Sequence, residues 1–142
     1  MGQSIFFFMW ICCIDHSPRA AVFVASTPCS QGTRPAPGIP KEGGCELIKW
    51  RLQLFKDTYM LDCDYGMPKQ GTRGFVNGGH HVHREGKWRM EGKKVLRLDP
   101  GKPAESISFL RLNGHLLHLL DGRQRLMIGN GGWSYTLNRI QQ

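Results

Sequence analysis

Apolar and polar residues alternate with a period of two in many short runs of this chain. In residues 45–56, CELIKWRLQLFK, one face carries Ile48, Trp50, Leu52 and Leu54, and the other carries Lys49, Arg51 and Gln53. In residues 58–66, TYMLDCDYG, one face carries Tyr59, Leu61, Cys63 and Tyr65. This period predicts half-buried β-strands, because successive side chains of a strand point to opposite faces. A helix over the same residues would place charges within its apolar stripe.

Similar runs continue to the end of the chain, separated by turn residues. After a first strand at residues 21–27, they are FVNGGHHVHRE, GKWRMEG, KKVLRLDPG, SISFLRLNG, HLLHLLDGR, RLMIGNGG and WSYTLNRI. Asn113-Gly114 and Asp121-Gly122 are hairpin signals. Strands spaced by about 8–12 residues predict an antiparallel meander. Because no helix is predicted to cover an edge, we expect about eight strands to close into a small, lipocalin-like all-β barrel.

The alternation also predicts which side chains point into the barrel. The expected inward set is Ile48, Trp50, Leu52, Leu54, Tyr59, Leu61, Trp88, Leu96, Leu98, Phe109 and Leu120. Large side chains dominate this set, and they readily fill a narrow barrel. We therefore expect a mostly packed interior, with at most a shallow cavity near the Pro/Gly loop at residues 32–44. Trp50, Trp88 and Trp133 are candidates to line a ligand cavity, and the alternative is that they are aromatic core residues.

The length of 142 residues fits one domain, placed at residues 21–142 behind an N-terminal segment at residues 1–20. The apolar run at residues 5–14 is too short for a transmembrane helix, which needs about 20 residues. It has the length of a signal-peptide core, although no basic residue precedes it and no small-residue cleavage site follows. Cys12 and Cys13 suggest a lipoprotein, but bulky residues precede them. We expect an exported protein of the periplasm, the outer-membrane surface or the extracellular space.

Three cysteines remain if the N-terminal segment is removed. Cys29 and Cys45 bracket the Pro/Gly loop, which has no core-forming pattern of its own. We expect them to form a disulfide, which for a loop of about 15 residues is worth about 3 kcal/mol. Cys63 is expected to be free and at least partly buried. The alternative is three reduced thiols in a cytosolic protein.

Three histidines fall close together in GGHHVHREGKW, residues 78–88. On a strand, His81 and His83 point to one side and His80 to the other, and a His-x-His pair can supply two ligands to Zn²⁺ or Cu²⁺. The candidates for a third ligand are His115, His118, Asp62 and Asp64. The alternative is that the imidazoles decorate a solvent-facing strand, and the lack of an adjoining acidic second shell favours this alternative. The main expectation is therefore no cofactor, with copper or zinc as the competing hypothesis.

The composition and the motifs narrow the classes of partner and activity that we expect. The formal net charge of +8 favours anionic partners in general. No nucleophile-elbow pattern occurs, and GNGGW at residues 129–133 lacks the ending of a phosphate-binding loop. We therefore expect no enzymatic activity. No RNA-module signature occurs and export is expected, so we expect no nucleic-acid partner. An envelope protein, an apolar small molecule or an anionic surface remain as expected partners.

The order of short motifs along the chain resembles that of a known family. The motifs are TPC at residues 27–29, the long alternating strand followed by TYML, then GKW, VLRLD, SISFL, LLHLLD and SYTLNR. This order resembles the NlpE N-terminal domain family over roughly residues 23–140, and is most similar to its uncharacterised Bacteroidetes-type members. Those domains are small envelope β-barrels, often lipoproteins, linked to copper resistance and surface-stress signalling. The resemblance implies a non-catalytic module that binds a ligand or a protein and senses stress.

This chain departs from that family at its cysteines. The copper-associated feature of the family is a Cys-x-x-Cys, and the matching positions here are Cys29 and Cys45. Their wide spacing suits a disulfide better than a two-thiolate metal site. The resemblance therefore does not carry metal binding to these two residues.

Overall fold

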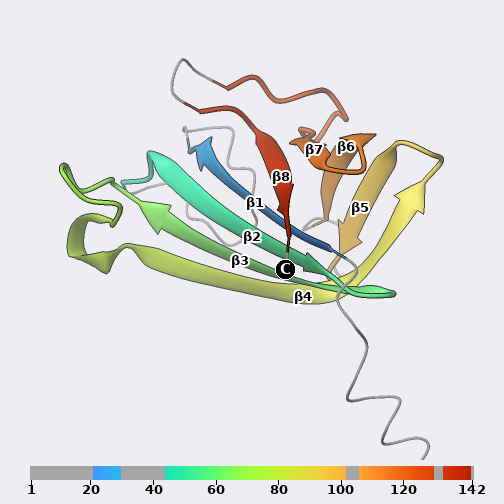
Figure 1. The fold of residues 1–142 in the computed structure, drawn as a ribbon, viewed down its shortest axis with the longest axis horizontal. Coiled ribbons are helices and arrows are strands. Elements are labelled where there is room, and N and C mark those ends of the chain that lie inside the picture. Colours follow the sequence, from blue (N-terminus) through green and yellow to red (C-terminus); the bar gives the residue numbers. More distant parts are fainter. Residues whose placement is uncertain (1–20, 30–43, 102–105, 130–132, 142) are drawn as a thin grey trace, which may run out of the picture.

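The computed structural model describes residues 21–29, 44–101, 106–129 and 133–141, and eight strands in these ranges form a closed antiparallel barrel (Figure 1). The strands are β1 (Ala21–Pro28), β2 (Leu47–Leu54), β3 (Thr58–Gly66), β4 (His80–Glu91), β5 (Val95–Asp99), β6 (Ile107–Asn113), β7 (Leu116–Leu119) and β8 (Thr136–Ile140). Each strand pairs with the next, and Val22 of β1 lies opposite Ile140 of β8, which closes the ring. A short 3-10 turn, η1 (Val76–Gly78), precedes β4. The predicted all-β barrel is confirmed.

The alternation of β2 and β3 sets the inner and outer faces of the barrel. Leu52 and Leu61 lie opposite each other and are almost fully buried, as are the other apolar residues of these two strands that share their face. Every member of the predicted inward set is buried except Trp88, which is half-buried. Apolar burial of this kind is the main force that holds such a barrel closed.

Trp50 reaches across the interior from β2 to β6. Its indole packs edge-on against the Phe109 ring, with the ring centroids 6.4 Å apart. Its Nε1–H donates to Thr27 Oγ1 at 2.8 Å, so the polar atom of this buried side chain has a partner. The barrel is therefore packed, as predicted, at the level of Trp50.

β4 is one long strand that changes its partners midway. Residues 80–87 pair with β3, and residues 87–91 pair with β5. Figure 1 shows β4 running beside β3 along its first part and then bending away from β3 to lie beside β5. A side chain at Gly86 would clash with the carbonyl oxygen of Asp99, so glycine permits the close approach of the two strands at this corner. The sequence pattern predicts two separate runs divided at Gly86, and this prediction is wrong.

The connection from β7 to β8 also differs from the prediction. The run RLMIGNGG is not a strand in its described residues, where only Leu126 forms an isolated bridge, to Leu120. The turn predicted at Asp121 is present, because Asp121 Oδ1 accepts hydrogen bonds from two backbone N–H groups that follow it. Met127 is buried in the core cluster, whereas Ile128 is 91% exposed. In its described residues, this segment therefore contributes one side chain to the core and adds no strand to the sheet.

Within the described ranges, no helix has the length and apolar character that crossing a bilayer requires.

Candidate metal centre

The register between β3 and β4 brings acidic residues of one strand opposite histidines of the other. Asp62 lies opposite His83, and Asp64 lies opposite His81. Because Leu61 and Cys63 point into the barrel, Asp62 and Asp64 point outward, on the same face as the two histidines. The pairing of two adjacent antiparallel strands thus assembles an outer-face cluster of four side chains.

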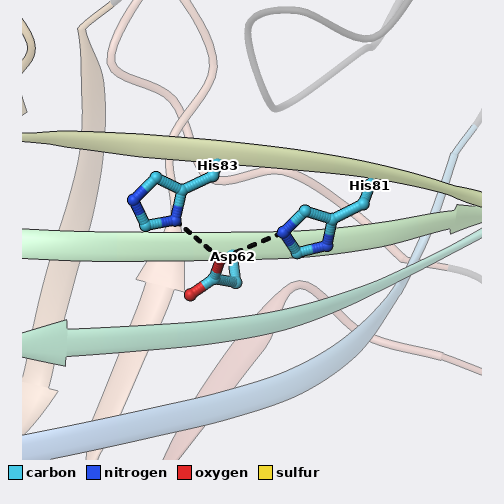
Figure 2. A group of neighbouring side chains, drawn as sticks. All are labelled: Asp62, His81 and His83. Atoms are coloured by element: carbon cyan, nitrogen blue, oxygen red, sulfur yellow. Dashed lines mark hydrogen bonds and ion pairs between the residues drawn. The ribbon is translucent and has the colours of Figure 1, made fainter.

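Asp62 is the centre of this cluster. Figure 2 shows its carboxylate between the two imidazoles, with contacts from Oδ1 to His81 Nε2 at 3.1 Å and to His83 Nδ1 at 2.7 Å. One potential ligand atom from each of the three residues lies within 4.8 Å of the others. Two of the side chains come from β4 and one from β3. The group therefore needs both the His-x-His spacing on β4 and the register of β4 against β3.

The second nitrogen of each imidazole also faces a carboxylate. His81 Nδ1 lies 2.7 Å from Asp64 Oδ1, and His83 Nε2 lies 3.5 Å from Glu85 Oε2. In metalloproteins, such outer carboxylates fix the ring and the tautomer of a metal-binding histidine. The expectation that no acidic second shell adjoins the histidines was therefore wrong. Glu85 is visible two residues after His83, but Asp64 joins the group only through the register.

These carboxylates favour the protonated form of both histidines. The hydrogen bond to Asp64 raises the pKa of His81, and the hydrogen bond to Asp62 raises the pKa of His83. A neutral imidazole has only one N–H donor, whereas the imidazolium ion has two and can satisfy a carboxylate at each end. A metal ion that binds here must therefore displace protons.

The cluster lies on an open surface. The exposed fractions of the side chains are 52% for His81, 38% for His83 and 27% for Asp62. On β2, Arg51 lies opposite Asp62 and Lys49 lies opposite Asp64, so basic residues flank the acidic ones. Lys49 Nζ donates to the carbonyl oxygen of Arg73 rather than to a carboxylate of the cluster. Solvent and these basic neighbours weaken the electrostatic attraction for a cation but leave the ligand atoms accessible.

The donor set is two imidazole nitrogens and one carboxylate oxygen. Such a set suits Zn²⁺ or Cu²⁺, with metal–ligand bonds of about 2.0–2.2 Å. A tetrahedral ion with bonds of this length holds its ligand atoms about 3.4 Å apart. The three ligand atoms lie within 4.8 Å of one another, so they would have to move closer together to bind one ion. Three protein ligands would leave a further position for water or another ligand.

The other histidines do not join this group. His80 points to the opposite face of β4 and stacks on Tyr65, with ring centroids 5.3 Å apart. His118 on β7 contacts Thr136 Oγ1 at 2.9 Å and the carbonyl oxygen of Met127 at 2.7 Å. His115 lies in the turn between β6 and β7. Of the candidates for a third ligand, the described structure therefore supports Asp62, with Asp64 beside His81.

The predicted disulfide is present between Cys29 and Cys45, whose Cα atoms are 5.4 Å apart. It joins the residue that follows β1 to the segment that precedes β2. Cys63 is free and fully buried, as expected. The Pro/Gly loop, and the shallow cavity predicted near it, lie almost entirely outside the described residues.

The three candidate cavity tryptophans differ in their surroundings. Trp50 is a core residue, only 2% exposed. Trp88 is half-buried and donates from Nε1 to the carbonyl oxygen of Phe55 at 2.9 Å. Trp133 is 36% exposed and lies outside the core cluster. Its backbone approaches Gly129 so closely that a side chain at Gly129 would clash with the Trp133 carbonyl oxygen.

Comparison of the chain with models of protein families, with curated proteins and with solved structures gave no significant match. The resemblance to the NlpE N-terminal domain family stays a prediction from the sequence.

Proposed function

We propose that this protein is a non-catalytic, exported β-barrel that binds a divalent transition metal through Asp62, His81 and His83. The observation that carries the proposal is the convergence of three ligand atoms within 4.8 Å of one another on the outer face of β3 and β4. The carboxylates behind each imidazole support it, because they would orient the rings toward a shared ion. Copper or zinc binding is the competing hypothesis from the sequence, and the register of β3 against β4 supports it.

Copper is the metal that the donor set favours. Sites built from nitrogen and oxygen bind Cu²⁺ more tightly than Zn²⁺ under the Irving–Williams order. No thiolate contributes, because Cys29 and Cys45 form a disulfide and Cys63 is buried inside the barrel. The proposed metal site is therefore separate from the cysteine positions that the family resemblance associates with copper.

An oxidising compartment is the proposed location, and the disulfide supports it. Protein made in such a compartment should leave Cys29 and Cys45 unreactive toward an alkylating reagent until a reductant is added. Peptide mapping by mass spectrometry measures each cysteine separately. Alkylation of both residues in the native, unreduced protein would contradict the bridge and this location.

Calorimetric titration with Cu²⁺ and with Zn²⁺ tests the metal site. We expect sub-micromolar Cu²⁺ binding by the full chain, and loss of that binding in the His81→Ala/His83→Ala double variant. His80→Ala is the matched control, because His80 is on the same strand and points to the opposite face. The Asp64→Asn variant should weaken binding by about 10- to 100-fold, as expected of a carboxylate that orients a ligand.

The pH dependence supplies a second test of the same site. Protons compete with the metal for both imidazoles, so the metal affinity should rise as the pH rises through the raised pKa values of His81 and His83.

Two results of the calorimetric titration would refute the assignment of the site. They are an unchanged Cu²⁺ affinity in the double variant, and a loss of Cu²⁺ affinity in His80→Ala that equals the loss in the double variant. Binding that survives in the double variant would place the metal elsewhere in the chain.

A further inference from the structure

Arg84 is a basic residue on the inner face of the barrel. It lies opposite Leu61 in the β3–β4 register, so its side chain points to the face that carries the apolar core and away from the metal-binding cluster. The sequence pattern gave no reason to select this residue, since Arg84 sits beside Glu85 in an otherwise polar run.

The Nε atom of the Arg84 guanidinium is buried without a hydrogen-bond acceptor. No other buried side-chain nitrogen or oxygen in the described structure is in this state. A single hydrogen bond, from Nη1 to the carbonyl oxygen of His83 at 3.3 Å, is the described contact of the guanidinium. Arg84 as a whole is half-buried, but its buried Nε–H is one of five guanidinium donors, and a buried donor without an acceptor is costly. A buried polar atom without a partner calls for an explanation, such as an ordered water, an ion or a bound ligand.

The surroundings of Arg84 along β4 are apolar and only half covered. Val82, Trp88 and Met90 share its face, and each packs against the core while staying partly exposed. On the neighbouring strand β3, by contrast, the residues of the same face are fully buried. The change occurs because the residues of β4 other than Lys87 pair on one side only: residues 80–86 pair with β3, and residues 88–91 pair with β5. The inner stripe of β4, defined as Val82, Arg84, Trp88 and Met90, therefore lies at an open margin of the barrel.

We propose that this inner stripe binds a small amphiphilic carboxylate, with its carboxylate group on the Arg84 guanidinium and its apolar body against Val82, Trp88 and Met90. A planar guanidinium matches a carboxylate through two parallel N–H···O bonds, and such charge-assisted bonds are among the strongest in proteins. The apolar side chains recognise a hydrocarbon body and exclude hydrated inorganic anions. The ligand and the metal would then occupy opposite faces of the same strand.

Binding of decanoate, of its methyl ester and of acetate separates the two parts of this recognition. We expect decanoate to bind the full chain about 10- to 100-fold more tightly than the ester, because only decanoate carries the charge. Acetate should bind undetectably, because it lacks the apolar body. Titration calorimetry measures the affinities.

The Arg84→Met variant removes the charge and keeps an unbranched apolar side chain. It should fold, because it removes a half-buried side chain whose Nε–H has no acceptor, and it should bind decanoate no better than the methyl ester. Arg89→Met is the matched control, because Arg89 lies on the outer face of the same strand and its variant should retain the full preference. The His81→Ala/His83→Ala variant should also retain it.

Three results would overturn the proposal. They are equal affinity of the wild-type protein for decanoate and its ester, an unchanged preference in Arg84→Met, and a loss of preference in Arg89→Met of the same size. If Arg84→Met does not fold, Arg84→Lys takes its place, since lysine keeps the charge but not the planar fork. A preference reduced severalfold in Arg84→Lys supports the proposal, and an unreduced one contradicts it.

Discussion

Truncation of Trp50 tests whether the barrel is filled by its own side chains. Trp50 is 2% exposed, and a buried tryptophan removes about 200 Å² from water. At about 25 cal/mol per Å² this amounts to about 5 kcal/mol, and large-to-small changes of this type typically cost about 3–5 kcal/mol. Trp50→Ala also removes the donor to the buried Thr27 hydroxyl. We expect a loss of about 3–5 kcal/mol in the free energy of unfolding, a large part of the 5–15 kcal/mol that is typical of a domain.

Urea denaturation followed by circular dichroism measures this loss, with the disulfide kept oxidised in both proteins. Trp133→Ala is the control, because Trp133 is 36% exposed and outside the core cluster, and its truncation should cost clearly less. A loss below about 1 kcal/mol for Trp50→Ala would refute the packed interior. In that event the variant should also bind an apolar dye less well than the wild type, since Trp50 would then line a cavity.

Three other predictions follow from single contacts. Gly86→Ala should lower the free energy of unfolding by about 1–3 kcal/mol, because its Cβ meets the backbone of Asp99, whereas Gly114→Ala, which meets open space, should be milder in the same denaturation assay. Cys63 should resist alkylation in the native protein, because burial raises its pKa, and peptide mapping before and after unfolding checks this. Asp64→Asn should lower the pKa of His81 in an NMR titration; an unchanged pKa would exclude the proposed hydrogen bond as its cause.

The raised pKa of His81 also fixes the sign of its effect on stability. Protonated His81 gains its partner only in the folded state, so its contribution is fully present below the ordinary histidine pKa. That contribution is lost as the pH rises through the raised value. Because the imidazole is 52% exposed, solvent screening keeps the effect small, and NMR is a better probe of it than denaturation.

The sequence predicted the parts of the fold that depend on local alternation. β2 and β3 follow from the period of two in residues 45–66, and the buried face of both was identified correctly. β4 was not predicted as a whole, because Gly86 signals a turn in sequence but serves here to let β5 approach. Glycine has both uses, and only the position of the neighbouring strand distinguishes them.

The candidate metal centre was predictable only in part, for a related reason. The His81/His83 pair is a local pattern of one strand, so the sequence contains it. The contribution of Asp62 depends on the register of β3 against β4, and these strands are joined by the long connection at residues 67–79 rather than by a tight turn that would fix it. A shift of one residue would have placed Leu61 and Cys63 on the outer face instead. The exposure of Arg84 likewise depends on tertiary pairing, because β5 pairs with β4 from Lys87 onward and not at Arg84.

The change of partners along β4 also means that the strand should not open uniformly. Residues 80–86 pair with β3, residues 88–91 pair with β5, and Lys87 pairs with both. Local opening can occur at any free energy between nearly zero and that of global unfolding, so the first half of β4 should exchange its backbone amide hydrogens independently of the second half. A ligand that links β3 to β4 through Asp62 and His83 would slow that exchange without altering the rest of the barrel. Binding there would reduce the local opening of the first half of β4 and leave the shape of the fold unchanged.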